Sequence, residues 1–511
     1  MIKNTLNRII GTVLRREYSR VEHFRSRATS CQWDIFSRLI ERGKNTAFGT
    51  DHHFSSISSY EDFCKRVPVR TYESLFPYIE RCLYGEKNVL WDKPLRHFSK
   101  SSGTTNAQSK YIPISSESLS QCHIRAARDL VSSYLTLHPD SRMFTGKALR
   151  LGGSLRANDF GTGIKTGDLS AILMSNTPRW ADMYSTPCLK TSIIEDWNEK
   201  LPRMVEEVRR ADVTSLAGVP SWMLVMLNTV MEACGADDIT QVWPHLELFM
   251  HGGISFSPYR EIYKRIIPSH NMHYYEVYNA SEGFFAFQDT IEGGDMLLMS
   301  DHGVFYEFIP MSVFGTEREY ALPLEGVECG INYAMVITTN GGLWRYLIGD
   351  TVRFTSVNPY RIVITGRTKQ YINAFGEELM VENADKALLK ASQVCNCDVA
   401  EYTAAPVFME QSSNGAHQWI IEFNTPASDM ELFIDTFDAT LMELNSDYRA
   451  KRYSDVTLRR PLVNVVPRGT FYNWMESRGK LGGQNKVPRL SGDRTYVESI
   501  LALVGDNVES Y

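Results

Sequence analysis

The sequence predicts an α/β protein with a large N-terminal domain of mainly parallel α/β sheets, which includes a β-barrel-like subdomain, and a small α+β C-terminal domain. Between residues 148 and 278, short apolar runs, several of which end in glycine, alternate with helical patterns, as is typical of a parallel sheet. From Gly303, short strands separated by turn signals indicate an antiparallel or barrel-like subdomain. A mixture of helices and strands follows residue 366, so we place the domains at 1–366 and 367–511.

Composition excludes several classes of function. The 511 residues are 43% hydrophobic and 22% charged, which is ordinary for a globular protein with a large core. A net charge of −6 gives no electrostatic reason to expect nucleic-acid binding, and no apolar run approaches the roughly 18 residues of a membrane span. The nine cysteines are scattered and show no zinc-site spacing. We therefore expect free thiols in a cytoplasmic protein, with neither nucleic acid nor a membrane as partner.

The first 95 residues are expected to be mostly helical. Apolar residues recur at helical spacing near the start of the chain, at Leu6, Ile9, Ile10, Val13 and Leu14. Nearby basic residues imitate a mitochondrial presequence, but Glu17 and Glu22 follow and serine is scarce. The periodicity favours an amphipathic helix of the folded protein.

A hydroxyl-rich stretch from Ser101 to Lys110 is the segment around which we expect the function to be built. It reads Ser-Ser-Gly-Thr-Thr-Asn-Ala-Gln-Ser-Lys. Adjacent hydroxyls, backbone N–H groups and a terminal lysine suit an oxyanion such as phosphate, and Gly103 lets the backbone approach the ligand closely. A solvated Ser/Thr loop is the alternative for this stretch taken alone.

The segment 161–166 resembles part of a Walker A loop but lacks its spacing, so we interpret it as a hairpin turn.

Helices and strands alternate after this stretch. The patterns predict helices over 119–137, 201–210 and from 221, and strands over 148–151, 213–219, 246–253 and 273–278. Ligands bind parallel sheets beyond the carboxyl ends of the strands. Gly252 and Gly253 end one strand there, where an adenine ring could lie flat against the backbone, with a plain tight turn as the alternative.

The second half of the chain holds further expected elements and one candidate binding residue. Strands are predicted over 304–310, 333–338, 352–355, 362–365, 398–407 and 417–424, and helices from 376 to about 392 and over 428–444. Asp350 follows Gly349 at a strand end, where it could accept hydrogen bonds from two ribose hydroxyls; a turn aspartate that bonds its own backbone is the alternative. The glycine-rich, basic stretch 476–489 is expected to be a mobile loop that carries a cation, or else a surface loop with solvated lysines.

Four motifs, in the right order along the chain, resemble those of one family. They are the phosphate-loop stretch Ser101–Pro113, a Tyr-x-x-Ser-Glu-Gly-Phe-Phe pattern at Tyr278–Phe285, a Tyr-Arg-Tyr-x-x-Gly-Asp pattern at Trp344–Asp350 and a Gln-x-Lys-x-Pro-Arg pattern at Gln484–Arg489. Together they resemble the Gretchen Hagen family of acyl acid amido synthetases. That family belongs to the adenylate-forming superfamily of acyl-CoA synthetases, peptide-synthetase adenylation domains and luciferases. The match covers essentially the whole chain.

The chain departs from the family's motifs at four positions. Ala107 stands where glycine is frequent, Gln108 where glutamate is frequent, Trp344 where the third motif has tyrosine, and Leu347 where plant members commonly have arginine. The first two changes predict a less flexible phosphate loop and an altered nucleotide affinity. None removes a hydroxyl, acid or lysine to which we assign chemistry.

The resemblance implies a reaction in two halves. A carboxylate attacks the α-phosphate of ATP to give an acyl-adenylate and pyrophosphate, and an amine then attacks the acyl carbon and releases AMP. Because the first half brings an anion onto a polyanion, the site must supply positive charge and positioning. The superfamily also implies that the C-terminal domain is mobile and rotates near residue 366 between the halves.

Roles for individual residues follow from the same resemblance. The nucleotide-binding set is Ser101, Ser102, Gly103, Thr104, Thr105, Lys110, Gly252, Gly253, Tyr278, Asn279, Ala280, Ser281, Asp350 and Arg367. Within it, Tyr278 and the glycine pair flank adenine, and Asp350 with Arg367 fixes the ribose. The catalytic residues are Glu282, which holds Mg²⁺, and Lys486, which reaches the α-phosphate and the attacking carboxylate oxygen.

Substrates and rival functions are the least determined part of this interpretation. Trp222 and the helix after the phosphate loop are expected walls of a pocket for an aromatic or otherwise apolar acid, although a tryptophan is more often core. The implied cofactors are ATP and Mg²⁺, the partners are a small carboxylic acid and an amino acid, and we expect a monomer.

An acyl-CoA ligase is one alternative function. It would share the first half-reaction and differ in its acceptor. A nucleotide-binding protein without turnover is disfavoured by Glu282, Asp350 and Lys486, and a P-loop NTPase by the missing Walker spacing.

Overall fold

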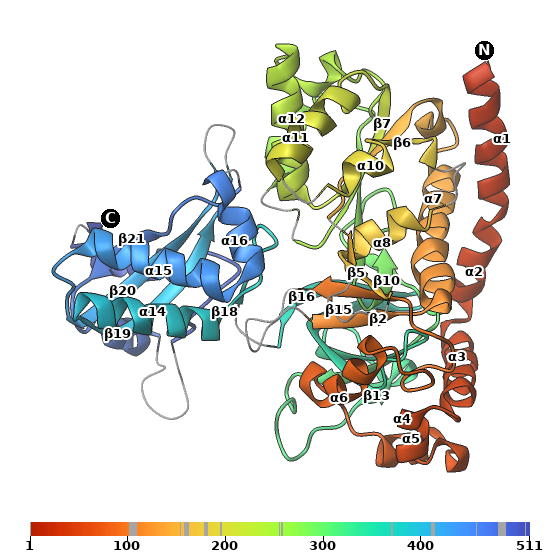
Figure 1. The fold of residues 1–511 in the computed structure, drawn as a ribbon, viewed down its shortest axis with the longest axis horizontal. Helices are drawn as coiled ribbons and strands as arrows, with labels where there is room; N and C mark the ends of the chain where they lie inside the picture. Colours follow the sequence, from red (N-terminus) through yellow and green to blue (C-terminus); the bar gives the residue numbers. More distant parts are fainter. Residues whose placement is uncertain are drawn as a thin grey trace.

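The structure is a computed structural model of the 511-residue chain (Figure 1). It describes residues 2–101, 110–153, 155–157, 163–177, 182–194, 197–254, 256, 259–368, 371–409, 414–455, 457–478, 487–505 and 507–511. Within these ranges, no helix combines the length and the apolar character needed to cross a membrane. All nine cysteines are free thiols, as expected.

One large mixed sheet organises the N-terminal part of the chain. Its twelve strands lie in the order β13 (Leu322–Pro323), β12 (Val304–Pro310), β14 (Asn332–Thr339), β15 (Tyr346–Val357), β16 (Tyr360–Arg367), β11 (Met296–Leu298), β10 (Gly283–Phe287), β9 (His273–Ala280), β8 (Leu248–Gly252), β7 (Val213–Gly218), β3 (Lys147–Arg150) and β6 (Ser185–Thr186). The predicted antiparallel strands are therefore continuous with the parallel ones in a single sheet.

The strands β9, β8, β7, β3 and β6 form the parallel half of this sheet. The helix α12 (Pro220–Cys234) shows why these segments fold as α/β units. It begins at Pro220, whose fixed φ suits a first helical position, and it ends at Gly235, which adopts a φ of +63° that glycine tolerates. The four strands predicted in this region are confirmed to within two residues, and β9 continues to Ala280.

The antiparallel half, from β10 to β16, contains one correction to the sequence prediction. The strand β15 begins at Tyr346, six residues before its predicted start, so Asp350 lies inside a strand and not at its end. The pairing of β15 with β14 shifts register between Ala334 and Val336, and Gly349 in this bulge has a φ of +96°. A bulge interrupts the two-residue alternation, which concealed the strand in the sequence.

Helices make up most of the N-terminal 83 residues. Those of seven residues or more are α1 (Ile2–Arg16), α2 (Tyr18–Ser26), α3 (Ala28–Gly43), α5 (Tyr60–Arg66) and α6 (Tyr72–Leu83). The helix α1 lies beside α7 (Arg125–Leu137), and α3 contacts β12 (Figure 1). A helical start to the chain is confirmed, and Leu14 faces the core while Leu6, Ile9 and Val13 are exposed.

A second, four-stranded sheet lies beside the large one. Its order is β2 (Lys110–Ile114), β1 (His97–Ser101), β5 (Lys165–Gly167) and β4 (Leu155–Ala157). The pairs β1–β2 and β4–β5 are antiparallel, whereas β1 and β5 are parallel. The turn predicted within 161–166 lies between β4 and β5, and residues 158–162 are outside the described part.

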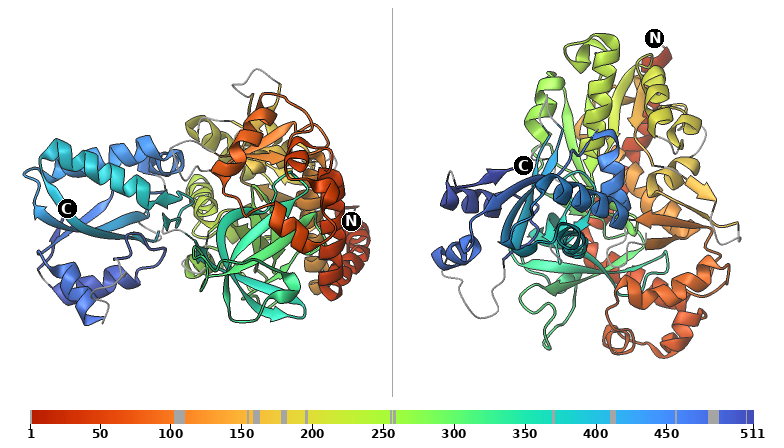
Figure 2. Two further views of the ribbon diagram at one scale, coloured as in Figure 1. Left: turned by 90° about the horizontal axis from the view of Figure 1, so that it is seen from below. Right: turned by 60° about the vertical axis from the view of Figure 1, so that its left-hand side comes forward.

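The C-terminal residues form a smaller unit that lies to one side of the large sheet (Figures 1 and 2). Its four-stranded sheet has the order β19 (Asp398–Val407), β20 (Ala416–Thr425), β21 (Leu462–Val466) and β22 (Glu509–Ser510). The helices α14 (Val381–Cys395) and α15 (Met430–Leu444) pack against each other. Both strands and the second helix predicted here are confirmed, while α16 (Ser446–Arg452), α17 (Thr470–Ser477) and α18 (Thr495–Val504) were not predicted.

The start predicted for the first C-terminal helix, Gly376, is wrong by five residues. The buried Glu377 carboxylate accepts hydrogen bonds from the backbone N–H groups of Ala374 and Phe375, and Glu378 has a φ of +39°. These interactions fold the segment back on itself, so the helix begins only at Val381.

Candidate active site

The carboxyl ends of β7, β8 and β9 meet at one edge of the large sheet, because parallel neighbours end on the same side. The strand β8 ends there in the predicted glycine pair. A Cβ atom on Gly252 would lie 2.3 Å from the Val277 carbonyl oxygen of β9, and Gly253 has a φ of +85°. Both positions thus require glycine for backbone reasons, and contact with adenine stays a prediction.

The predicted phosphate loop joins the two strands of a β-hairpin. Ser101 is the last residue of β1 and pairs with Lys110, the first residue of β2. Ser102, Gly103, Thr104 and Thr105 lie outside the described residues, so their assignment to phosphate stays a prediction. The hairpin therefore places Lys110, the residue that follows the loop, beside Ser101, the residue at which the loop begins.

A hydroxyl pair connects this hairpin to the large sheet. The Oγ atoms of Ser99, which is buried in β1, and of Ser281 lie 2.9 Å apart. Ser281 belongs to the two-residue turn between β9 and β10, next to Glu282. The structure therefore places the acidic second motif directly beside the strand that leads into the phosphate loop.

Glu282 lies in a charged environment drawn from distant parts of the chain. Burial raises the pKa of its carboxyl group to about 7, and the positive charges of Lys110 and Arg367 oppose part of that rise. The negative charge of Asp350 adds to it. Burial also lowers the pKa of Lys110, and Glu282 offsets that effect. The site thus contains a carboxylate and a lysine that stabilise each other's charged forms.

Asp350 is the centre of the hydrogen-bonded part of the site. The Tyr278 hydroxyl donates to Asp350 Oδ2 over 2.6 Å, and Arg367 Nε donates to Oδ1 over 2.7 Å. The same guanidinium donates to both oxygens of Glu378 and lies over the Tyr371 ring, 4.9 Å from its centroid. Arg367 therefore links an acid of the large sheet to an acid of the segment that leads into the C-terminal unit.

The third motif divides into a structural half and a half that reaches the site. Trp344 is fully buried, and its indole N–H donates to the Leu90 carbonyl oxygen over 3.1 Å. Arg345 forms an ion pair with the fully buried Glu307, with Nη2 2.8 Å from Oε1. Asp350, five residues after Arg345, accepts hydrogen bonds from Tyr278 and Arg367. The first residues of this motif thus anchor the N-terminal helical region to the sheet.

Sequence reasoning missed one residue beside the site, His123. It lies in a π-helical turn, Ser118–Ile124, that precedes α7, and π-turns are frequent at functional sites. Burial lowers the pKa of its imidazole to about 4, and the neighbouring Asn279 opposes only part of that shift. Neither ring nitrogen, nor Asn279 Oδ1, has a hydrogen-bond partner in the described part of the structure. No local sequence pattern marked His123, because its burial depends on the tertiary structure.

Two other predicted site residues lie elsewhere or are not described. Trp222, in the first turn of α12, lies under the ammonium group of Lys451 from α16, which is 4.3 Å from the centroid of its ring. The tryptophan is therefore at the contact between the N-terminal part and the C-terminal unit, where Ser221 also donates to the Phe375 carbonyl oxygen. Lys486 lies outside the described residues, although Arg489, three residues on, pairs with Asp385 over 2.6 Å.

Comparison with solved structures identifies the fold. The fold matches that of the GH3.15 acyl acid amido synthetase with a TM-score of 0.60, 19% identity and coverage of 96% of each chain. It also matches 2-hydroxyisobutyryl-CoA ligase, in complex with its acyl-AMP and CoA, with a TM-score of 0.54, 15% identity and coverage of 92% and 91%. The fold is therefore one shared by amide-forming and thioester-forming ligases.

Sequence comparison then defines the family. The GH3 family N-terminal domain matches residues 17–272, the central domain 297–367 and the C-terminal domain 382–495. The chain belongs to the GH3 family, which confirms the family suggested by the four motifs and places the chain among the acyl acid amido synthetases, which are ligases. Its relatives include a probable indole-3-acetic acid-amido synthetase of Arabidopsis thaliana, 24% identical over 94% of this chain and 92% of the relative. Another is an indole-3-acetic acid-amido synthetase of Oryza sativa subsp. indica, 24% identical over 92% of this chain and 89% of the relative.

Proposed function

We propose that this protein uses ATP to adenylate a small carboxylic acid and then transfers the acyl group to the amino group of an amino acid, forming an amide. The observation that carries the proposal is the charged cluster of Glu282, Asp350, Lys110 and Arg367. These residues come from four separate segments and meet at the carboxyl edge of the sheet, next to the hairpin of the phosphate loop. Such an arrangement can hold a nucleotide by its ribose and its phosphates at once.

The proposed roles follow the geometry of this cluster. Lys110 and the hydroxyls of residues 101–105 offset the negative charge of the phosphates, and Lys486 brings a second cation to the α-phosphate and the attacking carboxylate. The ribose hydroxyls would donate hydrogen bonds to the Asp350 carboxylate, whose two oxygens are already oriented by Tyr278 and Arg367. Positioning two anions against each other in this way is the main catalytic task of the first half-reaction.

The residues present also fit a magnesium ion. Mg²⁺ in nucleotide enzymes is held by one or two carboxylates together with substrate phosphates. Glu282 supplies one carboxylate, and no group of three or more metal-ligating side chains gathers anywhere in the described ranges. The ion, when bound, would neutralise phosphate charge.

The match to the GH3 family's central domain ends at residue 367, and the match to its C-terminal domain begins at residue 382. These limits support our proposed domain boundary at 366/367. We also propose a cytoplasmic monomer.

The proposed function can be tested by pyrophosphate release. The purified chain would be incubated with ATP, Mg²⁺ and a panel of carboxylic acids, alone, with pooled amino acids or with coenzyme A. We expect acid-dependent release that is stimulated by one or more amino acids, with the amide detected by mass spectrometry. Stimulation by coenzyme A with thioester formation would instead identify an acyl-CoA ligase. Nucleotide binding without release for any acid would contradict the proposal.

The raised pKa of Glu282 predicts that Mg²⁺ activation depends on pH. Only the carboxylate form binds the ion, and with a pKa of about 7 this form is a minority at pH 6 and predominates at pH 8. The Mg²⁺ concentration for half-maximal pyrophosphate release should therefore fall about fivefold from pH 6 to pH 7, about tenfold from pH 6 to pH 8, and little above pH 8. Titration of ATP itself contributes to any such profile, so the Glu282→Gln variant provides the background. Parallel profiles for parent and variant would remove Glu282 from the metal site.

Removal of the Asp350 carboxylate should weaken nucleotide binding. We expect Asp350→Ala to reduce AMP affinity by about 1–3 kcal/mol, because a charged hydrogen-bond acceptor is lost. Isothermal titration calorimetry with AMP measures this directly. Asp295→Ala is the matched control, because Asp295 accepts from Arg361 and Thr355 in the same half of the sheet. AMP affinity that is equal in Asp350→Ala and the parent protein would exclude the ribose role.

A further inference from the structure

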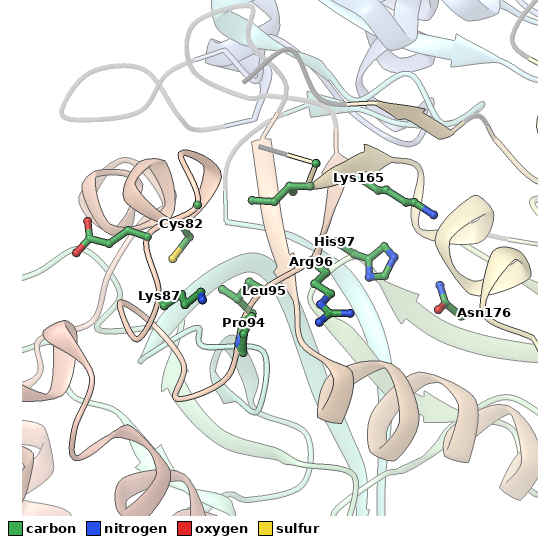
Figure 3. Close-up of a pocket in the computed structure, with 12 residues that line it drawn as sticks. Cys82, Lys87, Pro94, Leu95, Arg96, His97, Lys165 and Asn176 are labelled. Carbon is green, nitrogen blue, oxygen red and sulfur yellow. The ribbon is translucent and has the colours of Figure 1, made fainter. Parts of the chain in front are cut away.

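A pocket of about 560 Å³ lies at the end of β1 that is remote from the phosphate loop (Figure 3). It is formed by the chain leaving α6, the residues entering β1, the start of β5 and Asn176 after α8 (Leu169–Ser175). Its volume is in the range of pockets that hold small organic ligands. Cys82, Leu95 and Ile164 contribute apolar lining. Burial raises the pKa of the Cys82 thiol to about 12, so this cysteine serves as lining and not as a nucleophile.

Three cations from three different segments line the pocket. They are Lys87, which follows α6, Arg96, which precedes β1, and Lys165, which begins β5. The last two are held together by the backbone, because the Lys165 N–H donates to the Arg96 carbonyl oxygen over 3.0 Å. None of the three forms an ion pair with a carboxylate within the described ranges. The pocket thus gathers three positive charges, although the chain as a whole has a net charge of −6.

The remaining ionisable groups of the lining do not cancel this charge. Glu86 already accepts two hydrogen bonds from Arg81, one of them from Nε over 2.9 Å. His97 pairs with Lys165 across β1 and β5, and its pKa is lowered by burial and then by the charges of Lys165 and Arg96. The imidazole is therefore neutral at pH 7 and offers a hydrogen bond without a negative charge. The pocket presents three cations, a neutral histidine and an apolar floor.

The pocket is separate from the proposed nucleotide site. The strand β1 runs from His97 at the pocket to Ser101 at the start of the phosphate loop. The four steps from His97 to Ser101 span about 13 Å at 3.3 Å per residue. The lining of the pocket includes none of the cluster residues Lys110, Glu282, Asp350 and Arg367.

We propose that the pocket is a second ligand site, which binds a small phosphate monoester with an apolar substituent. Arginine and lysine side chains from separate segments suit an anion with several oxygens and a double charge, and the arginine fork matches phosphate geometry. The apolar substituent of the ligand would pack against the apolar lining of the pocket. The site is independent of the adenylation chemistry proposed above.

Calorimetric titration with phenyl phosphate, on the full chain saturated with AMP, tests this inference. We expect one-to-one binding, weakened at least tenfold in Arg96→Gln/Lys165→Gln, with AMP affinity unchanged in that variant. Inorganic phosphate, which lacks the apolar part, and phenol, which lacks the charge, should each bind more weakly than phenyl phosphate. Should the double variant fail to fold, the exposed Lys87→Gln should weaken binding at least threefold.

The matched control is Lys264→Gln/Lys390→Gln, which removes the same charge from exposed positions on α13 (Arg260–Ile266) and α14. It should bind phenyl phosphate as the parent does. Equal affinity in the two double variants would show that net charge alone attracts the probe, and would overturn the inference. Displacement of phenyl phosphate by AMP would overturn it as well, because the probe would then occupy the nucleotide site. So would a failure of phenyl phosphate to bind at all.

Discussion

Replacement of Lys486 by alanine is expected to slow acid-dependent pyrophosphate release at least a hundredfold, with AMP affinity changed less than threefold. In the first half-reaction a carboxylate approaches the α-phosphate, and the described cations near the cluster, Lys110 and Arg367, are already matched by Glu282, Asp350 and Glu378. A further cation must therefore offset the charge that develops between the two reactants. Loss of one such preorganised group typically costs two to three orders of magnitude in rate.

The measurement separates the two half-reactions. Pyrophosphate release reports adenylation, whereas amide formation from a synthetic acyl-adenylate bypasses it. We expect Lys486→Ala to fail in the first assay and to retain most of its rate in the second, because the acyl carbon of an adenylate is already activated. Lys480→Ala removes the same charge from the same glycine-rich stretch and should leave both rates unchanged. Equal adenylation by Lys486→Ala and the parent protein would remove this lysine from the mechanism.

Arg345→Met is expected to reduce the free energy of unfolding by about 3–5 kcal/mol, the usual cost of removing one partner from a buried ion pair. Glu307 is fully buried and accepts from Arg345 Nε and Nη2, from the Tyr60 hydroxyl and, over 3.9 Å, from the Cys64 thiol. Arg345 also donates to the Val67 carbonyl oxygen over 2.7 Å. The variant would leave a carboxylate in the core without its counter-charge, and would loosen the contact between the N-terminal helices and the sheet.

Urea denaturation checks this prediction, with two further variants as controls. Arg353→Met, at an exposed position on β15, the strand that follows Arg345, should change stability by less than about 0.5 kcal/mol. Adding Glu307→Leu to Arg345→Met should recover part of the loss, because an apolar pair can replace a buried ion pair at little cost. A loss below about 1 kcal/mol in the single variant would mean that Glu307 finds another partner or water.

Much of the fold and the chemical content of the site could be predicted from the sequence. Short-range patterns sufficed for the strands β3, β7, β8 and β9, because each is a short segment that contains apolar or aromatic residues. They failed where a tertiary interaction overrode the local pattern. The start of β15 was concealed by the bulge at Gly349, and the buried carboxylate of Glu377 delayed the start of α14. The register of β15 against β14 and the burial of Glu377 beside His417 depend on segments far away in the sequence, so local patterns did not reveal them.

The sequence by itself determined which residue types are available for chemistry and in what order: a hydroxyl-rich loop, a glycine pair, and the acids and lysines of four motifs. Only the tertiary structure decided how they are used. It showed that Asp350 is held by Tyr278 and Arg367, that Glu282 lies within reach of the charge of Lys110, and that Trp344 and Arg345 stabilise the core although they share a motif with Asp350. It also brought Lys87, Arg96 and Lys165 into one pocket. Burial, hydrogen bonding and the approach of like charges depend on distances in space, and the order of residues along a chain does not contain them.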